Sequence, residues 1–523
     1  MPYALLAACS NDSTTNPGKP DGGDTSPSTG GATATTGGSG GASGKPGSGG
    51  SNTSGDGGAT GGTTGSDHPD ASGTGGAPAS GSGGQTSDID GGAEDGGHVA
   101  FPTTPIVTAV SKTGPDRFYG VTTDADGNVF AVGQIADSND TTADFSMLLA
   151  KFTKEGALDE SFGDRGIVIR NVIAGGTNGE LYRGVAVQST GKIIVSGQAE
   201  HAGAADARDR DLVVLRFNAD GTKDTDFGTD GIVTLDLSTG VVSGSAFAAD
   251  SAWGLALYDD DRIVVSGGEV RNGATDTDFV LVRLKADGTR DDSFADNGVF
   301  ALDTQIGGMS NNASPRNVTI LPGKQGVIGA GYQPIPGADT GPVVYKVDDT
   351  GKLDTTFGTD GVFSDRPLTE QTETYMAAIQ PDATGTGYSL VTTGYGRELD
   401  TETTDIVSLR LTSDGKLDTT YGTNGVARVD IGGFGDNSRR LVVLPDRRVL
   451  LVGGGRSTSA DVDGTFVLLT ADGKPDTTFA PKGFKTVDLG GPADFLWSVA
   501  LMPDKTTAVA AGIMGVGTSP TPP

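Results

Sequence analysis

Short runs of apolar and alternating residues follow one another from residue 101 to near the end of the chain. Gly184–Gln188 and Lys192–Gly197 are rich in aliphatic and β-branched residues, and Asp211–Phe217 alternates apolar and polar positions. A period of two residues is that of a strand with two unlike faces. The Asp/Gly-rich stretch Asp124–Asn128, between two such runs, is typical of a tight hairpin turn. The pattern therefore predicts units of four short strands.

A signature of the form Gly-x-x-Asp-x-x-(Phe/Tyr)-(Gly/Ala)-x-x-Gly closes the third run of six units, at intervals of 58 to 67 residues. Its glycines and aspartates suit a turn with positive backbone φ and local side-chain caps. We expect its aromatic residue to pack between neighbouring units. Repeats of this length that each encode several strands bury their apolar faces against copies of themselves, as the blades of a propeller do. The six signatures begin at Gly156, Gly221, Gly288, Gly351, Gly415 and Gly473.

The number of strands indicates how the array closes. The first and second strands of the unit occur seven times, the last pair being residues 496–502 and 506–512, after which the third and fourth strands are missing. Residues 105–110 form an unpaired strand before the first complete unit. If they join the last pair, both ends of the chain build one blade and the ring has no free edge. We therefore expect an all-β, seven-bladed β-propeller, with six blades plus an extra hairpin as the alternative.

These motifs resemble the delta-60 repeat, which is found in strings in bacterial surface and secreted proteins. The resemblance covers residues 101–512 and rests on the run from the third strand through Asp-Gly to the Phe-Gly-x-x-Gly signature. The order of strand and turn motifs is also similar to that of NHL repeats, in which a Gly-Val-Ala-Val run is the innermost strand of a blade. Ala295, Ala480 and Pro475 depart from the pattern. The resemblance implies a β-propeller and no settled activity.

Composition changes at about residue 100. Up to that point the chain is mostly Gly, Ser, Thr, Ala, Asp and Pro, with almost no large apolar side chain. Such a segment cannot bury enough surface to offset the entropy of ordering it. We therefore expect a disordered tether over residues 10–100, a folded domain over residues 101–515 and a disordered tail over residues 516–523.

The chain has one cysteine, Cys9, which follows Leu6, Ala7 and Ala8. This run resembles the lipobox of bacterial lipoproteins, in which the apolar segment is removed and the cysteine carries lipid. Since no basic region precedes it, residues 1–9 match a truncated signal. With the long tether, the resemblance implies a lipoprotein of myxobacterial type on the outer membrane or cell surface. No run of about 18 apolar residues occurs, so we expect membrane association only through Cys9.

Acidic residues outnumber basic ones by 67 to 37, which gives a net charge of −30. This balance makes nucleic acids and anionic lipid headgroups poor partners. Acidic side chains gather in the loops between second and third strands, where oxygen ligands could hold Ca²⁺. No segment follows a twelve-residue Ca²⁺ loop, so we favour a solvated acidic surface and expect no cofactor. These acids are Asp137, Asp140, Asp144, Asp206, Asp209, Asp211, Asp276, Asp278, Asp400, Glu402, Asp405, Asp461 and Asp463.

The best functional lead is one residue near the start of each innermost strand. Aligned across units, this position holds only aromatic and arginine side chains. If the first strand lines the channel, these residues form a collar at the mouth with the long loops. Stacking and forked hydrogen bonds at such a collar suit a sugar ring or a carboxylate. The expected binding residues are Tyr119, Arg183, Trp253, Arg316, Tyr375, Arg440 and Trp497.

Catalytic motifs are not recognisable. Two of the three histidines, His68 and His98, lie in the tether, and only His201 belongs to the domain. No nucleophile, phosphate-binding or zinc motif has the expected flanks. We therefore expect a monomeric binding module, not an enzyme, whose partner is a surface glycan or protein. The alternatives are an extracellular carbohydrate-active enzyme that uses acidic residues in the channel mouth and a purely structural envelope scaffold.

Overall fold

The protein is described here by a computed structural model. Outside the described residues lie the predicted tether except Ser10, the predicted tail, and the predicted calcium candidates Asp137, Asp140 and Asp206. Within the described part of the chain, no helix is long and apolar enough to cross a membrane. The structure describes residues 5–10 (backbone only), 105–108, 110–111, 114–136, 138, 143–173, 180–202, 209–238, 250–270, 276–306, 312–400, 402–457 and 461–515.

The described strands form four-stranded sets, each of which we treat as one blade. In the first blade, β3 (Asp116–Thr123), β4 (Val129–Ala136), β5 (Phe145–Phe152) and β6 (Ile167–Arg170) pair antiparallel in sequence order. The next five blades repeat this order. They comprise β7 (Leu181–Val187), β8 (Ile193–Glu200), β9 (Arg210–Phe217) and β10 (Ile232–Leu235); β11 (Ser251–Leu257), β12 (Ile263–Glu269), β13 (Asp278–Leu284) and β14 (Val299–Leu302); β15 (Ser314–Ile320), β16 (Val327–Ile335), β17 (Ala338–Val347) and β18 (Val362–Phe363); β19 (Gln371–Pro381), β20 (Tyr388–Arg397), β21 (Asp405–Thr412) and β22 (Val426–Val429); and β23 (Asn437–Val443), β24 (Val449–Gly455), β25 (Asp463–Leu469) and β26 (Phe484–Val487).

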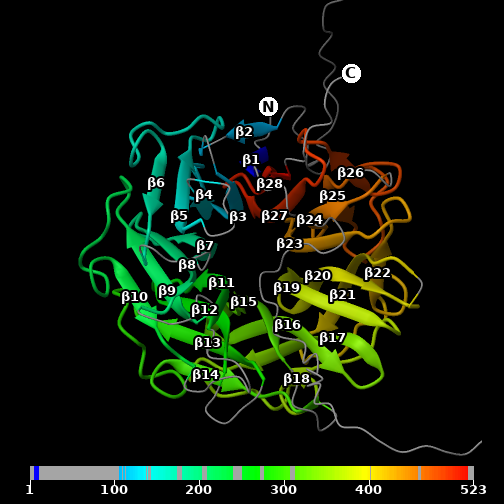
Figure 1. The fold of residues 1–523 in the computed structure, drawn as a ribbon. Coiled ribbons are helices and arrows are strands. Elements are labelled where there is room, and N and C mark those ends of the chain that lie inside the picture. The colour runs from blue at the N-terminus through cyan, green and yellow to red at the C-terminus, as the bar shows by residue number, and fades with distance from the viewer. Residues whose placement is uncertain are drawn as a thin grey trace, which may run out of the picture. The chain divides into compact units, whose positions relative to one another are not determined.

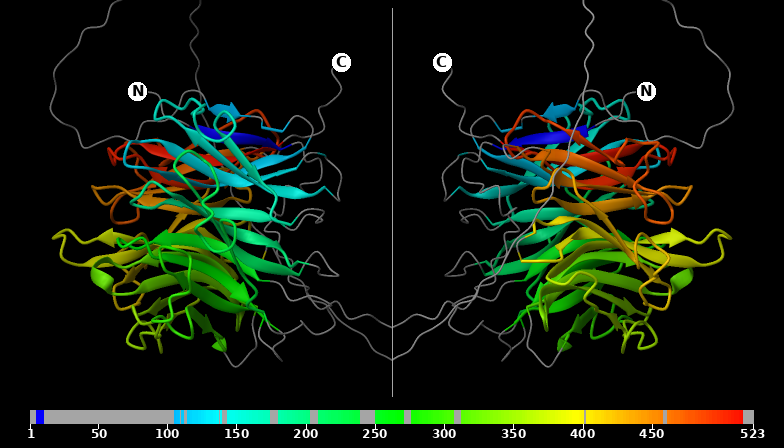
Figure 2. Two further views of the ribbon diagram at one scale, coloured as in Figure 1. Left: turned by 90° about the vertical axis from the view of Figure 1, so that its left-hand side faces the viewer. Right: turned by 90° about the vertical axis from the view of Figure 1, so that its right-hand side faces the viewer.

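The blades surround a central axis (Figures 1 and 2). The first strand of each blade contacts the first strand of the next, from β3 through β7, β11, β15, β19 and β23 to β27 (Phe495–Leu501), which contacts β3 again. A single parallel bridge, Thr340 to Gln371, also joins the fourth and fifth blades at their edges. The core is divided among the contacts between blades: one apolar cluster, for example, joins Leu212 and Val214 of β9 to Val265 of β12. The predicted all-β propeller fold is confirmed.

The two ends of the chain meet in the remaining sheet. Its strand order is β2 (Ile106–Thr108), β1 (Leu5–Ser10), β28 (Ala508–Gly515) and β27. The sequence predicted that residues 105–110 would complete this sheet, and β2 does belong to it. However, β1 lies between β2 and β28 and is parallel to both. This strand was not predicted, because residues 1–9 were assigned to a signal. In the sheet, β1 occupies the position that the third strand has in the other blades.

At four junctions the aromatic residue of a signature packs against the first glycine of the next signature. Phe227 is fully buried, and a Cβ atom added to Gly288 of the following signature would lie 2.6 Å from its ring. Tyr421 and Gly473 have the same relation, also at 2.6 Å. Because these glycines also have positive φ, the position requires a residue without a side chain. The expected packing of the aromatic residue between neighbouring blades is confirmed.

A basic residue near the end of the third strand completes this junction. The Nε atom of Arg283 donates a hydrogen bond to the signature carboxylate of Asp291 (2.8 Å), and its Nη1 atom donates to the carbonyl of Asp349 in the next blade (2.7 Å). The guanidinium also stacks over the buried ring of Phe294, 4.4 Å from its centroid. Arg410 binds Asp418 and the carbonyl of Ala471 in the same way. The signature aspartate is thus a structural anion, as its presence in every unit suggested.

Buried acids just before the innermost strands hold the preceding loops. Asp436 accepts backbone hydrogen bonds from Ile431 (2.8 Å) and Arg456 (2.9 Å). Burial raises its pKa to about 7, although the two backbone N–H donors act in the opposite direction. Burial raises the pKa of Asp494 and of Glu180 to about 7 in the same way. By contrast, the hydrogen bond from Lys151 lowers the pKa of Asp159 to about 2.

These opposite shifts predict a stability maximum at mildly acidic pH. An acid with a raised folded-state pKa stabilises the fold below its unfolded pKa near 4, and that contribution is lost as the pH rises to about 7. The contribution of Asp159 is lost as the pH falls from about 4 to about 2. We expect the free energy of unfolding, measured by urea titration, to be highest near pH 4 to 5. Asp436→Asn should flatten the decline between pH 5 and 8, whereas Asp126→Asn at an exposed turn should not. An unchanged slope in Asp436→Asn would contradict this account.

Candidate binding site in the central channel

Each innermost strand carries a β-bulge at an equivalent position. In β3 the register shifts between Phe118 and Gly120, and in β11 it shifts between Ala252 and Gly254. A bulge leaves one residue unpaired and re-aims its side chain. The residues in the seven bulges are Tyr119, Arg183, Trp253, Arg316, Tyr375, Arg439 and Trp497, which we call the bulge ring.

Six of the seven predicted binding residues are members of this ring, and the seventh differs by one position. In β23 the unpaired residue is Arg439, and Arg440 pairs with Val452 of β24. The sequence Ser438-Arg439-Arg440 offers two arginines in succession, so alignment across units could not decide between them. A register error of one residue turns the side chain to the other face of the strand.

Cation–π stacking connects the ring residues. The guanidinium carbons of Arg183 and Arg316 each lie 3.7 Å from the ring centroid of Trp253. The guanidinium of Arg316 also lies 5.1 Å from the ring centroid of Tyr375. An arginine over an aromatic face is attracted by the quadrupole of the ring, most strongly by tryptophan. Trp253 is therefore held between two cations.

The stacking continues on the other side of the channel. The guanidinium of Arg439 lies 4.0 Å from the ring centroid of Tyr375 and 5.2 Å from that of Trp497. Trp497 meets Tyr119 edge to face, with ring centroids 5.0 Å apart. Aromatic and arginine residues alternate in the sequence because their side chains stack on one another in the bulge ring.

The bulge ring is packed and not open. Trp253 and Arg439 are 3% exposed, and Tyr119 and Trp497 are 7% exposed. The sequence analysis placed these side chains at an open mouth, whereas the structure buries them against one another. Stacking explains why these side chains are buried, because each guanidinium covers an aromatic face that would otherwise be exposed to solvent.

Arg440 lies inside the channel and reaches across it. Its guanidinium donates hydrogen bonds to the backbone carbonyls of Trp253 (3.3 Å), Arg316 (3.4 Å) and Tyr375 (3.2 Å), which belong to three other blades. Burial, together with the positive charges of Arg316 and Arg439, lowers its pKa to about 10. The channel therefore holds cationic groups close enough to repel one another.

The positive charges of the channel exceed the negative ones. Among the described residues, Arg316, Arg439 and Arg440 form no ion pair with a carboxylate. Glu373 is the acid whose charge acts on Arg316 and Arg439, and its own oxygens accept hydrogen bonds from Gln371 and Tyr375. The Nε and Nη1 atoms of Arg439 are buried without a hydrogen-bond partner. In a chain of net charge −30, this interior is locally cationic.

A cavity of about 280 Å³ lies beside the bulge ring, and all seven innermost strands contribute to its wall. Most lining residues follow the ring positions by one to three residues along their strands, so the cavity lies on the side of the ring away from the strand starts. This location differs from the predicted mouth. The lining residues are Gly120, Val121, Thr122, Arg183, Gly184, Val185, Ala186, Trp253, Leu255, Asn317, Met376, Arg440, Ser498, Val499 and Ala500.

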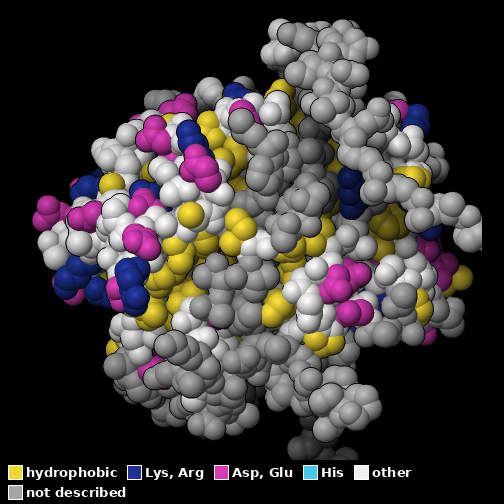
Figure 3. Space-filling model, turned by 90° about the horizontal axis from the view of Figure 1, so that it is seen from above, with side chains coloured by type: hydrophobic (Ala, Val, Ile, Leu, Met, Phe, Trp, Pro, Cys, Tyr) yellow, Lys and Arg dark blue, Asp and Glu magenta, His cyan; other side chains and the backbone are white. Residues whose placement is uncertain are grey.

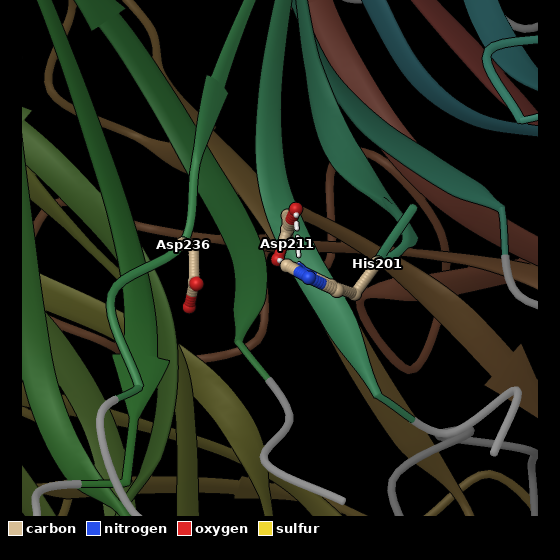
Figure 4. Close-up of side chains that lie close together, drawn as sticks. All are labelled: His201, Asp211 and Asp236. Atoms are coloured by element: carbon tan, nitrogen blue, oxygen red, sulfur yellow. Dashed lines mark hydrogen bonds and ion pairs between the residues drawn. The ribbon is translucent and has the colours of Figure 1, made fainter. Parts of the chain in front are cut away.

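The predicted acidic loop residues lie elsewhere, near the starts of the third strands. Figure 4 shows one group, in which Nδ1 of His201 lies 2.9 Å from Oδ1 of Asp211, with Asp236 beside them. The hydrogen bond to Asp211 raises the pKa of His201. Sequence reasoning overlooked the aspartates that end the outer strands, although Gly231–Asp236 already ended in one. The four groups are His201, Asp211 and Asp236; Asp276, Asp278 and Asp303; Asp405, Asp430 and Asp436; and Asp461, Asp463 and Asp488.

Several of these acids already have partners. Arg428 forms ion pairs with Asp405 and Glu402, and Asp436 binds backbone N–H groups. On the surface, acidic and basic side chains are intermixed where the rim is seen from above (Figure 3). In the group of Asp405, Asp430 and Asp436, two of the three carboxylates therefore already have partners. The cavity draws on all seven innermost strands and is the stronger candidate for a binding site.

Comparison with known proteins supports the fold. A family model described as "Domain of unknown function (DUF5122) beta-propeller" matches residues 188–227 and 259–294, in the second and third blades. No curated protein matches the chain. Among solved structures, a glucose dehydrogenase is similar at 11% identity and a TM-score of 0.36, over 64% of this chain and 92% of that one.

Two further structures have similar values. An α-L-arabinanase of Penicillium chrysogenum, complexed with arabinobiose, is 12% identical, with a TM-score of 0.38 over 64% of this chain and 90% of its own. Sqt1 of Chaetomium thermophilum is 12% identical, with a TM-score of 0.38 over 76% of this chain and 93% of its own.

These neighbours correct one expectation. The sequence analysis concluded that the chain is not an enzyme because it contains no recognisable catalytic motif. Arabinanases and a glucose dehydrogenase are among the similar propellers, so that conclusion is overturned. Likeness at 11% to 13% identity concerns the fold and assigns no reaction to this chain.

The packed ring predicts the behaviour of tryptophan fluorescence, because Trp253 and Trp497 are the only tryptophans of the chain. We expect a blue-shifted emission maximum in the native protein, and acrylamide quenching several times weaker than in the urea-unfolded protein. Trp497→Phe leaves the signal of Trp253 alone, and that signal should be at least as well protected. Quenching as efficient as in the unfolded chain would mean that the ring is open to solvent.

Proposed function

We propose that this propeller is a ligand-binding module whose ligand occupies the cavity at the centre of the ring. The observation that carries the proposal is the composition of the wall, to which every innermost strand contributes. Ligand sites are typically concave and mostly apolar, with a few convergent polar groups. Each strand is fixed by its own blade, so the cavity needs little reorganisation to accept a ligand.

The residues that line the cavity bear on the alternative of a carbohydrate-active enzyme, which the sequence left open. A glycosidase mechanism needs two carboxyl groups that face each other across the substrate. Among the described residues that line the cavity, none is an Asp or Glu. The acidic groups lie at the strand ends instead. Binding is therefore the activity that we propose for the cavity, and a glycan or protein partner would place only one small terminal group in it.

Filling the cavity tests this proposal. The ligand panel contains small neutral sugars, organic acids and short peptides, and binding is detected by saturation-transfer NMR with the full chain. Ala186 lines the cavity, whereas Ala219 lies in an exposed turn. We expect Ala186→Phe to abolish the binding of any ligand that the wild type binds, and Ala219→Phe to preserve it. Equal binding by both variants, or no binding by the wild type, would overturn the proposal.

We also propose that the module is displayed, as a monomer, on a bacterial outer membrane or cell surface through lipid on Cys9. The support is the run Leu6-Ala7-Ala8-Cys9 followed by the long low-complexity tether. In the structure the same run forms most of β1. Removal of residues 1–8 would take four of the six residues of β1 out of its sheet, so processing and β1 pairing exclude each other.

Protein isolated from its native cells distinguishes the two states. We expect it in the membrane fraction, with an N-terminal peptide that begins at lipid-modified Cys9 in mass spectra. Cys9→Ser should move the protein to the membrane-free fraction. An intact N-terminal peptide through Ser10, without lipid, would contradict the anchor and leave β1 as a permanent part of the propeller.

A further inference from the structure

We propose that the cavity selects an organic carboxylate with a short apolar body, the carboxylate facing Arg440 and Arg183. The inference rests on the proposed binding function and names the chemical class of its ligand. It extends to the free C-terminus of a peptide, because that group presents the same chemistry. Three observations carry it: the polarity of the cavity wall, the excess of buried positive charge, and the size of the cavity.

The wall of the cavity is amphipathic. Two guanidinium groups, on Arg183 and Arg440, lie beside the bulge ring. Neutral polar side chains of Asn317 and Ser498 also line the cavity, and most of the remaining lining side chains are aliphatic, such as those of Leu255 and Met376. Guanidinium groups bind carboxylates through short, charge-assisted hydrogen bonds. An anion without an apolar part would leave the aliphatic wall unused.

Little negative charge offsets the buried positive charge of the ring: Glu373 is the acid whose charge acts on Arg316 and Arg439. Arg316 is 6% exposed and Arg439 is 3% exposed, and neither forms an ion pair with any described carboxylate. The Nε atoms of both lack a hydrogen-bond partner. Burying a cation without a partner is costly. Arg440 lines the cavity, and the positive charges of Arg316 and Arg439, together with burial, lower its pKa. An anion bound beside Arg440 would offset part of this repulsion.

The size of the cavity limits the ligand. About 280 Å³ lies just below the range for small-molecule sites, roughly 300 to 1,000 Å³. It accommodates an acid of the size of benzoate or isovalerate, or the last side chain of a peptide, but not an oligosaccharide. Because a neutral sugar ring offers no charge to the guanidinium groups, the structure favours the carboxylate over the sugar that the sequence left as an equal choice.

The test compares acids with neutral isosteres and uses the full chain. The probes are benzoate and isovalerate against benzamide and isovaleramide, and a valine-terminated peptide against its C-terminal amide. Binding is measured by calorimetry and by tryptophan fluorescence, since both tryptophans belong to the bulge ring. We expect each acid to bind at least ten-fold more tightly than its amide, and added salt to weaken the acids alone. If only the free acids bind, the ligand is a small metabolite-sized acid; if the peptide acid also binds, the cavity accepts chain ends.

Two variants distinguish recognition of the negative charge from occupation of the cavity. We expect Arg440→Met to weaken acid binding at least ten-fold and to leave the weak binding of amides unchanged, and Arg440→Lys to restore part of the acid affinity. Arg440→Met also removes three hydrogen bonds to backbone carbonyls, so the fold of this variant is checked by circular dichroism. If the variant does not fold, the comparison of acids with amides in the wild type decides whether the ligand is a carboxylate. Equal affinity for acids and amides, with loss of both in Ala186→Phe, would overturn the carboxylate assignment and keep the binding module. Acid binding that neither Arg440→Met nor Ala186→Phe changes would place it outside the cavity and overturn both.

Discussion

The propeller depends on the contact between an aromatic ring of one blade and a glycine of the next. The signatures put this contact at four junctions, at Gly221, Gly288, Gly415 and Gly473. At one of them Arg410 stacks on the ring of Tyr421 and binds the backbone of the following blade. Nothing larger than glycine fits at these four positions, because an added Cβ atom would lie 2.6 to 3.0 Å from the ring. The repeated contact holds neighbouring blades together, and the first strand of each blade lies against the first strand of the next around the ring.

The fold could be predicted because repetition makes local signals redundant. A turn such as Asp124–Asn128 is weak evidence alone, but the same turn chemistry in successive units fixes the strands on either side. The central site was harder to predict, since it depends on single residues. Arg440 was taken for Arg439 because two arginines are adjacent and a bulge, which no local pattern marks, decides which of them is unpaired. That the ring is buried could not be inferred either, because burial there follows from contacts between blades.

The termini show another limit of sequence reasoning. The sequence indicated that the last blade would borrow a strand from the start of the chain, and β2 belongs to that sheet. It did not indicate β1, because the same apolar residues suit a cleaved signal and a buried strand equally well. The acids ending the outer strands were missed for a different reason: each lies in a different segment from the loop acid that it approaches, so their proximity follows from register between β9 and β10 and their counterparts.

The sheet that joins the two ends of the chain has a mechanical consequence. Force applied to the N-terminus of the chain would act first on β1, which is paired with β2 at three positions and with β28 at six. Tension would detach this seam while the six blades built from consecutive strands keep their pairing. The sheet that joins the two ends of the chain is thus the part of the ring that we expect to open first under load.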